Sequence, residues 1–68
     1  MSAPAALQAF EPKLVQGLYN LAHFERGDGA WYQVPYGRGD ITYCASPSSP
    51  FLRFPTLAAL AAHLECNP

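Results

Sequence analysis

Two histidines and two cysteines are the side chains of this sequence best suited to metal binding or redox chemistry. They are His23, Cys44, His63 and Cys66, and the last two have the His-x-x-Cys spacing that metal ligands use on a helix. A structural zinc site normally has two closely spaced pairs of ligands, whereas His23 and Cys44 are each isolated in the sequence. We therefore predict neither a metal nor another cofactor. A zinc site at these four residues and a Cys44–Cys66 disulfide remain the alternatives.

Catalysis is not expected from these side chains. Cys44 with His23 or His63 would be the only cysteine–histidine pair, and no acidic residue stands where it would orient an imidazole. The five carboxylates are dispersed along the chain rather than paired. A chain of 68 residues also has little room for a pocket of about 300 Å³ with organised side chains around it. The sequence therefore predicts a protein without enzymatic activity.

The scarcity of charge is the most informative feature of the composition. Charged residues make up 13% of the chain, well below the typical quarter, whereas half of the residues are hydrophobic. A small domain has a large surface to cover, so some apolar side chains must stay exposed, and exposed apolar patches usually mark an interface. The four basic residues are scattered, whereas binding to DNA usually depends on clustered lysines and arginines. We therefore expect a protein partner rather than a nucleic acid.

The predicted elements begin with a flexible arm over residues 1–11, in which residues 5–7 could form a short helical turn. A single small domain is predicted over residues 12–68. Pro12 suits the first position of a helix, and the apolar spacing of Leu14, Leu18 and Leu21 fits one helical face. These features predict a helix from Pro12 to about Phe24.

Three short segments rich in strand-forming residues follow the predicted helix. They cover residues 30–34, 41–45 and 51–54, and turns rich in glycine, serine and proline separate them. Thr56 can cap a second helix that runs from Leu57 to about Cys66. The predicted fold class is α+β, with an N-terminal helix, a three-stranded antiparallel meander and a C-terminal helix.

Aromatic and arginine side chains concentrate in the predicted sheet. Neighbouring strand residues point to opposite faces, so Trp31 and Tyr32 cannot both face the helices. Some of these side chains should therefore lie on an open face or an edge, and tryptophan, tyrosine and arginine contribute most strongly to binding interfaces. The candidate protein-binding residues are Trp31, Tyr32, Tyr36, Arg38, Phe51 and Arg53.

Several short sequence segments between Gly29 and Leu64 together form a recognisable order along the chain. They are Asp40-Ile41-Thr42-Tyr43, Ser46-Pro47-Ser48, Arg53, and a helix that carries Leu57 and Leu60. In this order they resemble methyl-CpG-binding domains, which implies a small sheet backed by a helix that reads DNA in the major groove with arginines. Arg38 and Arg53 would then be the base-reading candidates. The chain departs from the family in having one extra residue before Ser46, in lacking the flanking basic residues and in its net charge of −1.

The remaining expectations concern location and partners. No secretory signal, no apolar stretch of about 20 residues and no disulfide framework is apparent, so we expect a cytoplasmic protein that does not associate with membranes. The sequence predicts a small interaction module that acts as an inhibitor, an adaptor or a regulatory subunit. Its partner would be another protein or a second copy in a homodimer, bound through the aromatic-rich sheet and hairpin. A nucleic-acid-binding module that uses the sheet face is the alternative.

Overall fold

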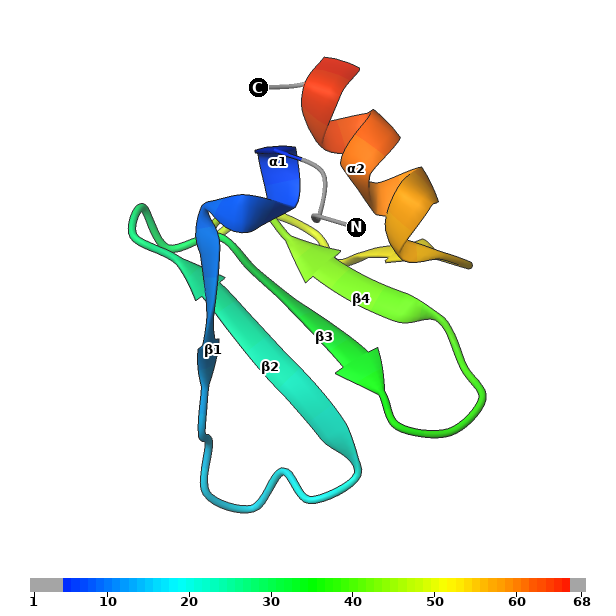
Figure 1. Ribbon diagram of the computed structural model, residues 1–68. Coiled ribbons are helices and arrows are strands. Elements are labelled where there is room, and N and C mark those ends of the chain that lie inside the picture. Colours follow the sequence, from blue (N-terminus) through cyan, green and yellow to red (C-terminus); the bar gives the residue numbers. More distant parts are fainter. Residues whose placement is uncertain (1–4, 67–68) are drawn as a thin grey trace.

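A five-stranded antiparallel sheet with two helices forms the described part of the chain, residues 5–66 of the computed structural model (Figure 1). The strands are hydrogen-bonded in chain order, so that the sheet is a simple meander with β1 and β5 at its edges. The elements are α1 (Ala5–Gln8), β1 (Phe10–Lys13), β2 (Leu21–Arg26), β3 (Trp31–Pro35), β4 (Ile41–Cys44), β5 (Leu52–Phe54) and α2 (Leu57–Cys66).

The α+β class, the antiparallel meander and the C-terminal helix are confirmed. Helix α2 begins at Leu57 as predicted, because the Thr56 hydroxyl accepts a hydrogen bond from the backbone N–H of Ala59 at 3.1 Å. This bond satisfies one of the backbone donors that a helix leaves unpaired at its start. The short helical turn predicted near residues 5–7 is confirmed by α1.

The predicted helix over residues 12–24 is wrong, and so is the count of three strands. Pro12 lies within β1, the chain then loops, and β2 begins at Leu21. Gly17 has a φ of +91°, which no position inside a right-handed helix adopts, and Leu14 of the predicted apolar face is fully exposed. The spacing of the leucines fitted a helix, but alternation between the two faces of a strand is the pattern that the fold uses.

An aromatic stack explains why this segment is extended. The Tyr32 ring on β3 lies 4.7 Å from the Phe24 ring on β2, in parallel, and 4.9 Å from the Phe10 ring on β1, edge to face. Tyr32 and Phe10 are buried, and aromatic pairs of this kind contribute about 0.5–1.5 kcal/mol each beyond the area they bury. Each ring comes from a different strand, so the stack forms only if both β1 and β2 are strands.

The core lies between one face of the sheet and the two helices. Helix α1 packs against α2, and Leu7 of α1 is buried with Phe10 in the same hydrophobic cluster. Leu7 and Phe10 therefore anchor residues 5–11 of the predicted arm to the domain, and residues 1–4 of it lie outside the described residues. The remaining buried members of the cluster are Ala30, Tyr32, Ile41, Tyr43, Leu60, Ala61 and Leu64.

The tight turn between β2 and β3 sets the register of this pair. The backbone N–H of Arg26 donates to the carbonyl of Ala30 at 2.7 Å, and Gly29 takes a φ of +98° to close the turn. One Asp28 carboxylate oxygen accepts from the Arg26 guanidinium at 2.9 Å and from the Ala30 N–H at 3.2 Å. These donors hold the pKa of the Asp28 carboxyl below its usual value, the Arg26 side-chain bond contributing most.

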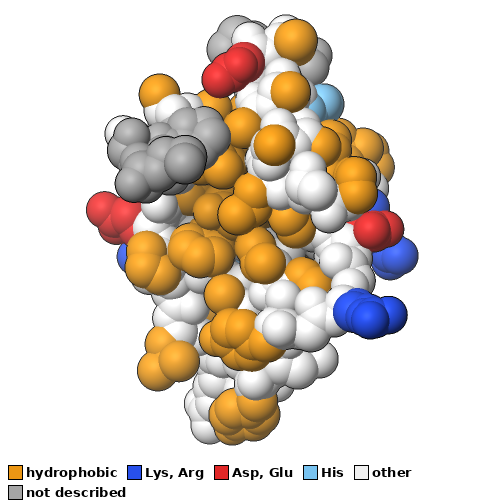
Figure 2. All heavy atoms as spheres, turned by 45° about the vertical axis from the view of Figure 1, so that its right-hand side comes forward, with side chains coloured by type: hydrophobic (Ala, Val, Ile, Leu, Met, Phe, Trp, Pro, Cys, Tyr) orange, Lys and Arg blue, Asp and Glu red, His pale blue; other side chains and the backbone are white. Residues whose placement is uncertain are grey.

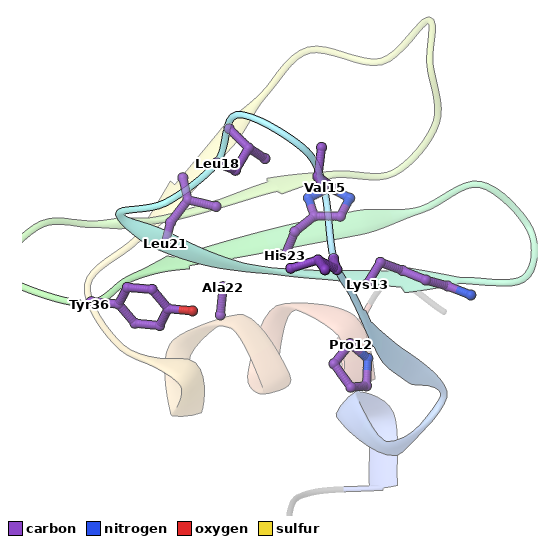
Figure 3. A pocket seen from close by; sticks show the side chains of 9 residues that line it. Pro12, Lys13, Val15, Leu18, Leu21, Ala22, His23 and Tyr36 are labelled. Carbon is purple, nitrogen blue, oxygen red and sulfur yellow. The ribbon is translucent and has the colours of Figure 1, made fainter.

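The two helices are too small to cover the whole sheet. Five strands span about 19 Å across the sheet, whereas the ten residues of α2 are about 15 Å long and pack against β4, β5 and α1. Part of the helix-bearing face therefore stays accessible over β1 to β3, where Ala22, Phe24 and Val34 are only partly buried. Figure 2 shows hydrophobic side chains gathered over the centre of the molecule and charged side chains near its margins. Neither α1 nor α2 covers the opposite face of the sheet, here called the open face (Figures 1 and 3).

Alanine substitutions at Leu60 and Leu14 test whether residues 12–24 form the observed strands and loop or the helix that the sequence predicted. Leu60 is fully buried, so we expect Leu60→Ala to lower the free energy of unfolding by about 2–5 kcal/mol. Leu14 is fully exposed, so Leu14→Ala should change it by less than about 0.5 kcal/mol. Urea denaturation of both variants makes the comparison. A comparable loss in the two would show that Leu14 is packed into the core, as a helix over residues 12–24 would require.

Because Tyr32 is buried, the free energy of unfolding should depend on pH in the alkaline range. Burial raises the pKa of the Tyr32 hydroxyl above the ordinary value of about 10. Both states hold the proton below that pH, and as pH rises the unfolded chain loses it first, so the free energy of unfolding falls from about pH 10 up to the folded-state pKa. We expect Tyr32→Phe to reduce this fall between about pH 9 and 11, as measured by urea midpoints. Tyr36→Phe, which removes the same hydroxyl from an exposed tyrosine, is the matched control.

Candidate interaction surface on the open face of the sheet

The strand register places a continuous row of polar side chains across the open face. Since Phe24, Tyr32 and Tyr43 face the core, the residues next to them in each strand point the opposite way. Each member of the row is paired with the next across neighbouring strands. From β1 to β5 the row is Lys13, His23, Gln33, Thr42 and Arg53. A second row beside it is Glu11, Glu25, Trp31 and Cys44.

His23 is the centre of a hydrogen-bond network on this face. The side-chain amide N–H of Gln33 donates to His23 Nδ1 at 3.1 Å, so the neutral ring carries its proton on Nε2. Nε2–H in turn donates to a Glu25 carboxylate oxygen at 2.9 Å. The His23 side chain is only 10% exposed, and its ring lies 5.5 Å from that of Trp31. Both ring nitrogens are therefore engaged in hydrogen bonds, and the one to Gln33 joins β2 to β3.

Trp31 and Phe51 form an aromatic pair on the same face. Their ring centroids are 5.3 Å apart with an edge-to-face orientation, and Phe51 is 65% exposed. Trp31 is itself held against His23. Arg53, two residues beyond Phe51, is also exposed and ends the polar row at the edge strand. The open face therefore presents an ordered aromatic pair bordered by hydrogen-bonding and charged groups.

The structure places the candidate binding residues predicted from the sequence in three different parts of the molecule. Trp31 and Phe51 are in contact, and Arg53 shares their face of the sheet. Tyr32 is buried on the other face, in the aromatic stack. Tyr36 and Arg38 are exposed in the hairpin between β3 and β4, and Figure 3 shows the Tyr36 ring on the helix-bearing side of the sheet.

Sequence reasoning missed His23, Glu25 and Gln33 as parts of one surface. The reason is the predicted helix, which placed His23 outside the sheet and away from Gln33. The signal was present in the alternation within β2, where the apolar Ala22 and Phe24 point one way and the polar His23 and Glu25 point the other.

The cysteines and histidines of the metal hypothesis are not brought together. His23 lies on the open face, whereas His63 packs against the rings of Tyr43 and Phe54 on the helix-bearing face. Cys44 is buried, and its thiol donates to the carbonyl of Ser46 at 2.8 Å. Cys66 is exposed, and neither thiol is in a disulfide. Within residues 5–66, no three His, Cys, Asp or Glu side chains lie close enough to hold a metal ion.

Comparison with known proteins assigns no family to this chain. No protein-family model matches it, and neither a curated protein nor a solved structure gives a significant match. In the part of the chain that the structure describes, no helix is long and apolar enough to cross a membrane.

Because the candidate ligands lie apart, we expect the stability of the fold to be insensitive to chelator and to reductant. We expect neither EDTA nor dithiothreitol to lower the melting temperature, because no metal-binding cluster and no disulfide is found among residues 5–66. Thermal melts with and without each reagent make the measurement. A decrease of more than about 10 °C, at least about 1 kcal/mol for a domain of this size, would contradict the expectation.

Proposed function

We propose that this chain is a small, non-enzymatic interaction module that binds a partner protein through the open face of its sheet. The observation that carries the proposal is the edge-to-face pair of the half-buried Trp31 and the exposed Phe51. Large aromatic side chains that stay accessible and ordered are the groups from which binding hot spots are made. An inhibitor, an adaptor or a regulatory subunit would all use such a surface in the same way.

The surroundings of the pair support this role. A protein interface usually has an apolar centre and a polar rim that exchanges hydrogen bonds with the partner. Here Arg53, Gln33 and Glu25 surround the aromatic side chains with cationic, amide and anionic groups. The His23 network and the strands hold several of these groups in place before binding, so less side-chain entropy is lost on association.

Binding of nucleic acid by the sheet is the second candidate. In favour of it, α2 backs the sheet, Arg38 is exposed in a hairpin, and Arg53 lies on the uncovered face, as the likeness to methyl-CpG-binding domains implies. Against it, Glu11 and Glu25 are paired on the open face, where they would repel a phosphate backbone. With only four basic residues and a net charge of −1, the chain offers little to displace counterions. The protein partner therefore stays the first proposal.

Alanine substitutions on the open face test the proposal. The wild-type chain is immobilised, a partner is captured from a native extract, and the purified partner is then titrated against variants. We expect Phe51→Ala and Trp31→Ala each to weaken binding at least tenfold, about 1.4 kcal/mol, with thermal melts that show an intact fold. Leu57→Ala, at an exposed leucine of α2, is the control and should bind normally.

A duplex containing a methylated CpG distinguishes the two candidates. If DNA is the ligand, Arg38→Ala and Arg53→Ala should abolish its binding, Phe51→Ala should not, and affinity should fall steeply with salt. A partner protein that binds the wild type and the Phe51 variant equally well would contradict the proposal of an open-face interface.

A further inference from the structure

The carboxylate of Glu25 constrains the hydrogen bonds of His23 on the open face. An ionised carboxylate only accepts, so the His23 Nε2 that lies 2.9 Å from a Glu25 oxygen must carry a proton. A neutral imidazole has a proton on one nitrogen only, which leaves Nδ1 as an acceptor. The side-chain nitrogen of Gln33, 3.1 Å from Nδ1, is the donor that this acceptor requires. While His23 is neutral, the Gln33 amide therefore has one permitted orientation.

Protonation of His23 reverses the requirement at Nδ1. An imidazolium carries a proton on both nitrogens, so Nδ1–H would face the N–H of Gln33 instead of accepting from it. The Gln33 amide restores the bond by rotating through half a turn, because its oxygen then accepts from Nδ1–H. The bond from Nε2–H to Glu25 is kept and becomes charged on both sides. The protonation state of His23 therefore determines which end of the Gln33 amide is left for other partners.

The charged groups around His23 come from β1 and β2. Glu25 on β2 attracts a positive charge on the ring, and Glu11, paired with Glu25 on β1, adds to this attraction. Lys13, paired with His23 on β1, repels the same charge. The groups that β3 places beside the ring, Gln33 and Trp31, are neutral. The loop from Leu14 to Asn20, part of which lines the same hollow as His23 (Figure 3), contains no charged residue.

We propose that His23 and Gln33 form a pH-sensitive switch on the open face of the sheet. With His23 neutral, the amide oxygen of Gln33 is the end left for other partners. With His23 protonated, the amide N–H groups take that place and the face gains one positive charge. Histidine is the side chain that ordinarily changes charge between about pH 5 and pH 8, so mild acidification operates the switch.

The switch lies next to the aromatic pair of the open face. The His23 ring is 5.5 Å from the Trp31 ring, and Gln33 is two residues from Trp31 on the same side of β3. A partner that donates to the Gln33 oxygen would lose that bond on acidification, whereas a partner that accepts from the amide would gain one. This consequence rests on the proposed function, whereas the switch itself rests only on the hydrogen bonds of His23.

Titrations of the purified chain test the switch without any partner. Trp31 is the only tryptophan, and we expect its fluorescence to change in one transition between about pH 8 and pH 5. The ¹⁵N signals of the His23 ring should show a proton on Nε2 alone at the upper pH and on both nitrogens at the lower pH. The side-chain amide signals of Gln33 should shift with the same midpoint. His23→Gln should abolish the fluorescence transition, and His63→Gln, at the other histidine, should retain it.

Gln33→Glu tests the coupling between the two side chains. A carboxylate at this position accepts from Nδ1–H, so we expect the midpoint of the transition to rise by about one pH unit or more. Circular dichroism checks that each variant is folded.

Three results would overturn the switch. They are a proton on Nδ1 at the upper pH, Gln33 signals that do not follow the titration of His23, and a midpoint that Gln33→Glu leaves in place. An absence of any His23 titration in this range would overturn it as well. None of these results bears on whether Phe51→Ala weakens partner binding, so the switch and the open-face interface fail separately.

Discussion

The stack of Phe10, Phe24 and Tyr32 is the interaction on which the rest of the structure depends. It joins β1, β2 and β3 through side chains that lie far apart in the sequence, and it places their neighbours His23 and Trp31 on the opposite face. The Arg26 guanidinium, which lies 5.2 Å from the Phe10 ring, adds a cation–π contact to the same group. Without the stack, the segment from Pro12 to Phe24 has little reason to be extended, and the open face loses its first two strands.

Small size imposes the second constraint. A chain of 68 residues cannot provide enough helix to cover both faces of a five-stranded sheet, or even all of one. Helix α2 covers the side of β4 and β5, and α1 adds a single turn that packs against α2. The surface that the helices leave uncovered includes the polar and aromatic open face and the apolar loop between β1 and β2. These two surfaces differ in chemistry.

Both edge strands of the sheet have features that disfavour pairing with another chain, so association is expected through the faces and the loops. β1 carries Pro12 between Glu11 and Lys13, and β5 is three residues long between Pro50 and Pro55. Proline, charge and short length all discourage the pairing of an edge strand with another chain. Association by added strands is thus opposed at both edges, whereas the open face and the β1–β2 loop carry no such protection.

The sequence by itself determined the elements whose signals are local. Thr56 and the leucine–alanine run defined α2, and the turns rich in glycine, serine and proline defined β3 to β5 and their antiparallel order. It also indicated that Trp31 and Tyr32 face opposite ways, since alternation is a property of the strand itself. Only the tertiary structure decided between helix and strand for Pro12 to Phe24, because Leu14, Leu18 and Leu21 fit a helix locally while the stacking of Phe10 and Phe24 on Tyr32 is a long-range contact. The His23–Glu25–Gln33 network followed from that decision, since it exists only when β2 lies beside β3.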